Sequence, residues 1–247
     1  MIKLNLRKGD STWRHGDRPI WSEDGVELSE DQVAARFSVP DARILFLICG
    51  FRVKKAGTAY RAIAYSAPKY TEIVEVWWPG GQWAGSFPFA RMRAKKSGDL
   101  FAAAIRRVFD RCAHMPYRVD VQAHSLGARV ALRAALSVYF DLILLAAPAV
   151  DNEALSPGGE FGCVDAGRIA VCWSIHDPVS FGYKLASMDN MLGVTGAEPA
   201  ADLPPFVTLH DFSHLDDHSG YQVDPKYFEL WDRLVNGVQY GVEDGRS

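Results

Sequence analysis

The sequence predicts an α/β protein with three layers, in which a mostly parallel sheet carries helices on both faces. Short continuous apolar runs at residues 44–48, 142–146 and 169–173 are typical of strands buried on both sides of a parallel sheet. Segments with helical spacing of apolar residues lie between the predicted strands, as at 100–114. Strands that alternate with helices in this way imply right-handed crossovers and parallel pairing.

Length and composition favour one globular domain over residues 1–247, with strands and a helix in 1–40 and a flexible tail at 241–247. Hydrophobic residues make up 48% of the chain and charged residues 23%, which is close to the average for globular proteins. The formal net charge of -3 gives no electrostatic basis for binding nucleic acid.

The sequence predicts a cytoplasmic protein without a membrane partner. The N-terminus lacks the apolar region of a signal peptide, and no apolar run approaches the length of a membrane span. The four cysteines form neither a CxxC pair nor a zinc-ligand spacing, which fits a reduced compartment. We therefore expect no metal site and no cofactor, and the sequence leaves the oligomeric state open.

The first part of the chain contains extended pieces at 3–6 and 19–21, followed by a helix that Ser29 and Gln32 begin as a capping box. The strand at 44–48 stops before Gly50. A helical segment at 56–66 and a strand at 73–77 follow, and the aromatic and basic stretch at 82–96 receives no assignment.

The second part of the chain continues the alternation. Asp224 is expected to cap the last helix, with Pro225 at its first position. The predicted strands are 117–122, 142–146, 169–173 and 206–210, and the predicted helices are 100–114, 126–139, 179–186 and the segment from 225. Ligands of such sheets bind at the carboxyl ends of the strands, so the residues after each strand are the candidates for a site.

Ser125 follows the strand 117–122 in the run Ala-His-Ser-Leu-Gly at 123–127. Small residues two positions before and after a serine are typical of a tight strand-to-helix turn, where larger side chains would collide. Such a turn exposes the hydroxyl and directs a helix N-terminus at developing negative charge. Ser125 is therefore the predicted nucleophile, although a serine here could also simply cap the helix.

A serine nucleophile needs a base and an orienting carboxylate, and on this type of sheet the chain order is serine, acid, histidine. Asp177, just after the strand 169–173, is the predicted acid, with Asp165 and Asp151 as alternatives. Three histidines follow the last strand or end it. We favour His218, next to the flexible Gly220, over the alternatives His214 and His210.

Five stretches carry a resemblance to a known family: Ile-Cys-Gly-Phe-Arg at 48–52, Trp-Trp-Pro-Gly at 77–80, His-Ser-Leu-Gly at 124–127, Ala-Ala-Pro-Ala-Val-Asp at 146–151 and Asp-His-Ser-Gly-Tyr at 217–221. In these the chain resembles the α/β-hydrolase superfamily over nearly its whole length. It is most similar to a branch of bacterial serine hydrolases of largely unassigned substrate. Cys49 stands where that branch has a histidine, and Ala123 stands where the usual pattern has a glycine.

The resemblance supports Asp177 and His218, and implies an oxyanion hole formed by the backbone N–H groups of Phe51 and Leu126. The residues expected beside the substrate are Gly50, Trp78 and His124. Aromatic residues crowd the segment that begins at the end of the predicted strand 73–77 and are expected to form the wall of an apolar acyl pocket. They are Trp77, Trp78, Trp83, Phe87 and Phe89.

The function expected from these features is hydrolysis of a small-molecule carboxylic ester through an acyl-enzyme. The same residues could cleave an amide, a thioester or a lactone, or transfer the acyl group to another acceptor. A non-catalytic binding member of the fold is a further alternative. No insertion has the length of a large lid domain.

Overall fold

The computed structural model describes residues 1–9, 11, 13–51, 70–81, 87–179, 190–197 and 202–236. The predicted helix at 56–66 and the predicted tail at 241–247 lie outside these residues, as does nearly all of the predicted helix at 179–186. The described strands are β1 (Ile2–Arg7), β2 (His15–Glu23), β3 (Val26–Leu28), β4 (Arg43–Ile48), β5 (Glu72–Trp77), β6 (Arg118–His124), β7 (Leu142–Ala146), β8 (Ile169–Trp173) and β9 (Val207–Asp211). The described helices are α1 (Glu30–Phe37), α3 (Phe87–Phe109), α4 (Gly127–Ala135), α6 (Leu192–Thr195) and α7 (Pro225–Asn236), with a 3₁₀ turn η3 (Gly220–Gln222).

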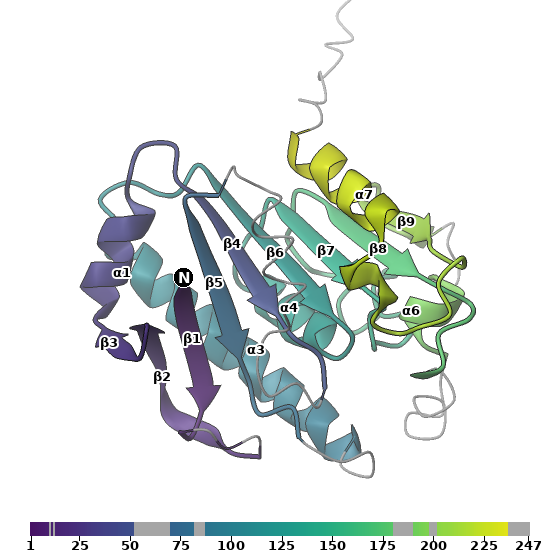
Figure 1. Ribbon diagram of the computed structural model, residues 1–247, viewed down its shortest axis with the longest axis horizontal. Helices are drawn as coiled ribbons and strands as arrows, with labels where there is room; N and C mark the ends of the chain where they lie inside the picture. The colour runs from purple at the N-terminus through teal and green to yellow at the C-terminus, as the bar shows by residue number, and fades with distance from the viewer. Residues whose placement is uncertain are drawn as a thin grey trace, which may run out of the picture.

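The described strands form one sheet in the order β3-β2-β1-β5-β4-β6-β7-β8-β9, in which β2 pairs antiparallel with both β1 and β3 and the other neighbouring strands pair parallel (Figure 1). Helices cover both of its faces. Alternate residues of β4 show this, because Phe46 belongs to the core under α1, α3 and α4, whereas Leu45 and Leu47 belong to the core under α7. The prediction of a three-layer, mostly parallel α/β fold is confirmed.

The long helix α3 differs from its prediction. It begins at Phe87 and ends at Phe109, whereas the sequence predicted a helix over 100–114 and left 82–96 unassigned. Ser97 and Gly98 lower the helix propensity at the middle of α3, but both are buried, and Gly98 lies in the contact with α4. A Cβ at Gly98 would lie 2.4 Å from the Cβ of Arg133, so close packing between the two helices requires the glycine.

The order of the central strands indicates where a ligand would be expected to bind. From β4 the chain first adds β5 on one side, and then crosses back to add β6 on the other side. The carboxyl ends of β4 and β6 are therefore neighbours, with Ile48 in register with Ala123. In open α/β sheets, this switch in direction is where ligands bind.

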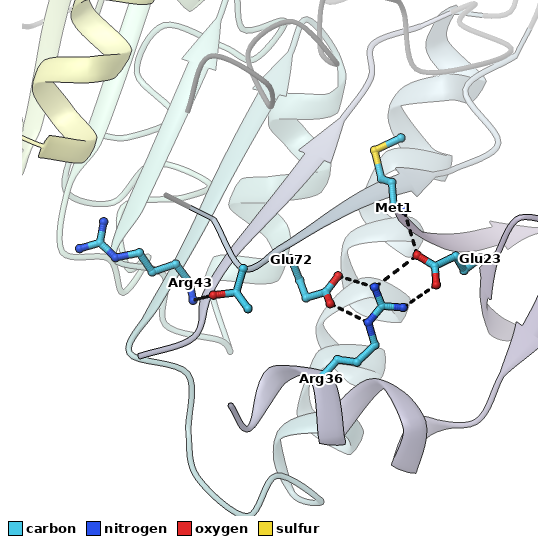
Figure 2. Close-up of polar contacts among 6 residues, drawn as sticks. Met1, Glu23, Arg36, Arg43 and Glu72 are labelled. Atoms are coloured by element: carbon cyan, nitrogen blue, oxygen red, sulfur yellow. Dashed lines mark hydrogen bonds and ion pairs between the residues drawn. The ribbon is translucent and has the colours of Figure 1, made fainter. Parts of the chain in front are cut away.

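A guanidinium ties the N-terminal strands to the rest of the sheet. Arg36 of α1 donates to both carboxylate oxygens of Glu72 at 2.6 and 2.9 Å, and to both of Glu23 at 2.6 and 3.2 Å (Figure 2). The amino group of Met1 also contacts Glu23, at 2.9 Å. Arg36 therefore joins α1 to β2 and β5 through paired, charge-assisted hydrogen bonds.

All four cysteines fall within the described residues, and none of the four is in a disulfide bond. No helix in the described ranges is both long enough and apolar enough to cross a membrane.

The ion pair around Arg36 predicts a specific pH dependence of stability. Hydrogen bonds from Arg36, followed by those from the N-terminal amino group, lower the pKa of Glu23 from 4.5 to about 2. A carboxyl group with a depressed pKa stabilises the fold above its unfolded pKa, and this contribution is lost as the pH falls toward the folded value. Urea denaturation between about pH 5 and pH 3 should therefore show a steeper loss of unfolding free energy in the wild type than in Arg36→Met. Equal slopes would contradict this account of Glu23.

Candidate active site

Ser125 occupies a sharp turn between β6 and α4. Its backbone φ of 54° lies in the left-handed region, which is costly for a residue with a side chain. Three backbone hydrogen bonds hold this conformation: the Ser125 N–H donates to the Ala146 carbonyl at 2.9 Å, and its carbonyl accepts from the N–H groups of Ala128 and Ala149 at 3.0 Å. Such an enforced conformation is typical of a nucleophile elbow.

The small residue after the turn is explained by the neighbouring strand. A Cβ at Gly127 would lie 2.6 Å from the carbonyl oxygen of Cys49 and 2.7 Å from that of Ile48. Both contacts are with backbone, which cannot move away easily. The glycine two positions after Ser125 therefore allows α4 to begin directly against the end of β4.

The loop after β4 lies against Ser125. A Cβ at Gly50 would lie 2.8 Å from the Cβ of Ser125 and 3.2 Å from Nδ1 of His124. The next residue, Phe51, contacts Phe87 of α3 edge to face, with 5.6 Å between ring centroids. Gly50 therefore permits an approach that any other residue would block.

Two backbone N–H groups beside the turn have no acceptor among the described residues. Within the part of the chain that the structure describes, the N–H groups of Phe51 and of Leu126 make no hydrogen bond. Leu126 is the N-cap residue of α4, so its N–H lies at the positive end of the helix dipole. Phe51 directly follows Gly50, and Leu126 directly follows Ser125. Because Gly50 and Ser125 lie against each other, the two N–H groups are near the same turn. The two N–H groups are thus available to a negatively charged oxygen.

His218 and Asp177 form a hydrogen-bonded pair. Nδ1 of His218 lies 2.6 Å from Oδ2 of Asp177, and the Asp177 side chain is 1% exposed. The other carboxylate oxygen, Oδ1, accepts from the N–H of Val179 at 2.9 Å. A carboxylate only accepts hydrogen bonds, so Nδ1 of His218 carries the proton and Nε2 is the basic nitrogen.

The loop that carries His218 is attached to the neighbouring strand ends. The Ser174 hydroxyl, just after β8, donates to the Leu215 carbonyl at 2.7 Å, and the N–H of Ile175 donates to the Ser213 hydroxyl at 3.2 Å. Nε2 of His124, the residue before Ser125, lies 2.8 Å from the main-chain oxygen of His218. The structure thus brings Ser125, Asp177 and His218 to one end of the sheet.

The residues named as alternative bases and acids do not join the His218–Asp177 pair in the structure. His214 pairs with Asp224 at 2.8 Å, and Asp224 also accepts from the N–H of Tyr227 at 3.0 Å at the start of α7. His210 contacts the Thr208 hydroxyl at 2.9 Å. Asp151 forms ion pairs with Arg91 at 2.9 Å and Arg129 at 3.1 Å. Asp165 is exposed in the loop before β8.

Trp78, which is predicted to lie beside the substrate, is buried in the structure. Trp78 is 1% exposed, and its indole N–H donates to the Cys49 carbonyl at 2.7 Å, so it supports the loop before Gly50 from behind. The Trp78 carbonyl accepts in turn from Nε of Arg7 at 2.8 Å, a contact between residues 71 positions apart that no sequence pattern predicts.

The other aromatic residues of that segment are also dispersed. Trp77 lies under the ammonium group of Lys3, which is 3.9 Å from a Trp77 ring centroid, and Phe89 is 57% exposed. Trp83 lies outside the described residues. Phe87 packs against the loop beside Ser125 through Phe51, and Trp78 contacts the same loop through the Cys49 carbonyl.

Comparisons with known proteins agree with this architecture. No protein-family profile matches the sequence, and no curated protein matches it. Solved structures do match. The product of gene lin2722 from Listeria innocua is 9% identical over 81% of this chain and 96% of its own, with a TM-score of 0.52. The esterase PE8 is 13% identical over 83% of this chain and 96% of its own, also with a TM-score of 0.52.

These likenesses and the sheet topology show that the chain has an α/β-hydrolase fold. At such low identity they concern the fold alone. The bacterial branch that the five sequence stretches resemble remains a prediction.

The hydrogen bond from Trp78 to Cys49 predicts that substitution of Trp78 destabilises the protein more than substitution of the adjacent Trp77. Trp78→Phe removes a buried indole donor and should lower the free energy of unfolding by at least about 1 kcal/mol. The control Trp77→Phe removes an indole bond of 3.3 Å to the Glu75 carboxylate at a partly exposed position, and should cost less. Chemical denaturation of both variants checks this, and an equal or larger loss in Trp77→Phe would contradict it.

Proposed function

We propose that this protein is a serine hydrolase that cleaves small-molecule carboxylic esters through an acyl-enzyme. The observation that carries the proposal is the left-handed Ser125 at the carboxyl edge of the sheet, followed by a helix and preceded by His124, which contacts His218 of a His218–Asp177 pair. Strain of this kind persists only where the surrounding structure enforces it, and it is concentrated at functional sites.

In the proposed reaction, Oγ of Ser125 attacks the ester carbonyl carbon while Nε2 of His218 takes the hydroxyl proton. Asp177 holds the imidazole by Nδ1 and stabilises the imidazolium that forms. The tetrahedral intermediate collapses, His218 returns the proton to the leaving alkoxide, and the alcohol departs. Water then attacks the acyl-serine with His218 as base, which releases the carboxylic acid and restores Ser125.

The oxyanion of the intermediate is proposed to bind between the N–H groups of Phe51 and Leu126. Their lack of an acceptor among the described residues supports this, because buried N–H groups normally find a partner. A preorganised donor of this kind is typically worth about 3 kcal/mol in the transition state.

The acyl group is proposed to lie against the Phe51–Phe87 ring pair, because Phe51 directly follows Gly50, which lies against Ser125. The name of the esterase PE8, a structural likeness, agrees with an ester as the substrate class. Amides, thioesters and lactones could acylate the same serine. These activities would differ from ester hydrolysis in the leaving group, and an acyltransferase would differ in the acceptor that takes the acyl group from Ser125.

Substitution of Ser125 tests the nucleophile. A fluorophosphonate should label the wild type once, at Ser125, and Ser125→Ala should neither be labelled nor hydrolyse p-nitrophenyl esters above the background. Ser137→Ala, an exposed serine just beyond the other end of α4, is the matched control and should keep full activity. Mass spectrometry locates the adduct, and full esterase activity in folded Ser125→Ala would refute the proposal.

The choice of base is tested by two histidines of one loop. His218→Ala should lower kcat/KM for p-nitrophenyl butyrate by about 10³-fold or more, because the serine loses its proton acceptor. His214→Ala should lower it by less than about 10-fold, because His214 contacts Asp224 and not Asp177. Similar losses in the two variants would show that the base is wrongly assigned.

A further inference from the structure

His124, at the end of β6, lies between the two loops that border Ser125. It is 5% exposed. On one side its Nδ1 faces Gly50, because a Cβ there would be 3.2 Å away. On the other side its Nε2 lies 2.8 Å from the main-chain oxygen of His218, and the two imidazole rings are 4.7 Å apart between centroids.

The contact with His218 fixes which nitrogen of His124 carries a proton. A carbonyl oxygen only accepts hydrogen bonds, so Nε2 of His124 must be the donor. Nδ1 is then unprotonated in the neutral ring. The tautomer of His124 is thus opposite to that of His218, whose Nδ1 donates to Asp177.

We infer that His124 is a positioning residue for the base: its Nε2–H holds the main chain of His218 so that the imidazole reaches Ser125. This inference rests on the proposed function. His218 is then held at two points, by its ring at Asp177 and by its carbonyl at His124. Together these two anchors fix both the place of the residue and the direction of its ring, and the bond to His124 is the one made directly by the main chain of His218.

The charge state of His124 suits this role. Burial, and after it the neighbouring His218, lower the pKa of His124 to about 3. His124 therefore stays neutral at ordinary pH. A protonated neighbour would oppose the imidazolium that His218 must become when it takes the serine proton. A neutral ring supplies a hydrogen-bond donor without that penalty.

The position also explains why the donor comes from the residue before the nucleophile. Successive residues of a strand point to opposite faces, so His124 and Ala123 diverge at the end of β6. Ala123 belongs to the core under α3 and α4, whereas His124 meets the loop before α7, which covers the other face. Hence the strand that delivers Ser125 also aligns the group that activates it.

Two amide variants of His124 test whether a hydrogen-bond donor is needed at the place of Nε2, or whether any polar side chain is enough. The glutamine nitrogen of His124→Gln can reach the place of Nε2, while the shorter side chain of His124→Asn places its nitrogen near Nδ1. We expect the rate of fluorophosphonate labelling and kcat for p-nitrophenyl butyrate to fall about 10–100-fold in His124→Asn, with KM within about twofold. His124→Gln should stay within about threefold of the wild type in both.

The outcomes distinguish this inference from the function on which it rests. A wild type that takes no label at Ser125 would overturn the proposed function itself. A labelled wild type with His124→Asn labelled equally fast, or with His124→Gln as slow as His124→Asn, would overturn only the positioning role. If thermal unfolding shows that His124→Asn does not fold, His124→Gln alone decides, because labelling far below the wild-type rate contradicts the inference and near-wild-type labelling supports it.

Discussion

The close approach of the carboxyl ends of β4 and β6 is the constraint on which the rest of the site depends. These strands are hydrogen-bonded neighbours, so the loops that leave them must pass each other almost in contact. A side chain at Gly50 would meet Ser125, and a side chain at Gly127 would meet the β4 backbone. With glycine at both positions, a loop N–H and a helix N-terminus can flank the same hydroxyl.

Hydrogen bonds from the surrounding residues hold the two loops and Ser125 in this geometry. Trp78 holds the loop after β4 through the Cys49 carbonyl, and three backbone bonds hold Ser125 in its left-handed conformation. Asp177 and the Ser174 hydroxyl hold the segment that carries His218. Apart from the local bond between Ala128 and Ser125, these contacts join segments that follow different strands, so the folded sheet sets most of the distances at the site.

Much of this was predictable from sequence because it depends on local chemistry. Continuous apolar runs predicted β4, β7 and β8, and the small residues around Ser125 predicted the turn between β6 and α4. The first half of α3 was not predictable, because Gly98 opposes a helix locally and is required only by contact with α4. The burial of Trp78 was also hidden, since its acceptor at Cys49 is 29 positions away. Sequence order allowed either His214 or His218 beside Asp177, and in the structure His214 contacts the cap of α7 instead.

The most direct test of the central claim is a crystal structure of the protein after reaction with a phosphonate ester. The account predicts phosphorus bonded to Oγ of Ser125, a phosphoryl oxygen within hydrogen-bond distance of the N–H groups of Phe51 and Leu126, and Nε2 of His218 facing Oγ. A phosphoryl oxygen turned away from both N–H groups, or a His218 ring that cannot reach Oγ, would contradict it.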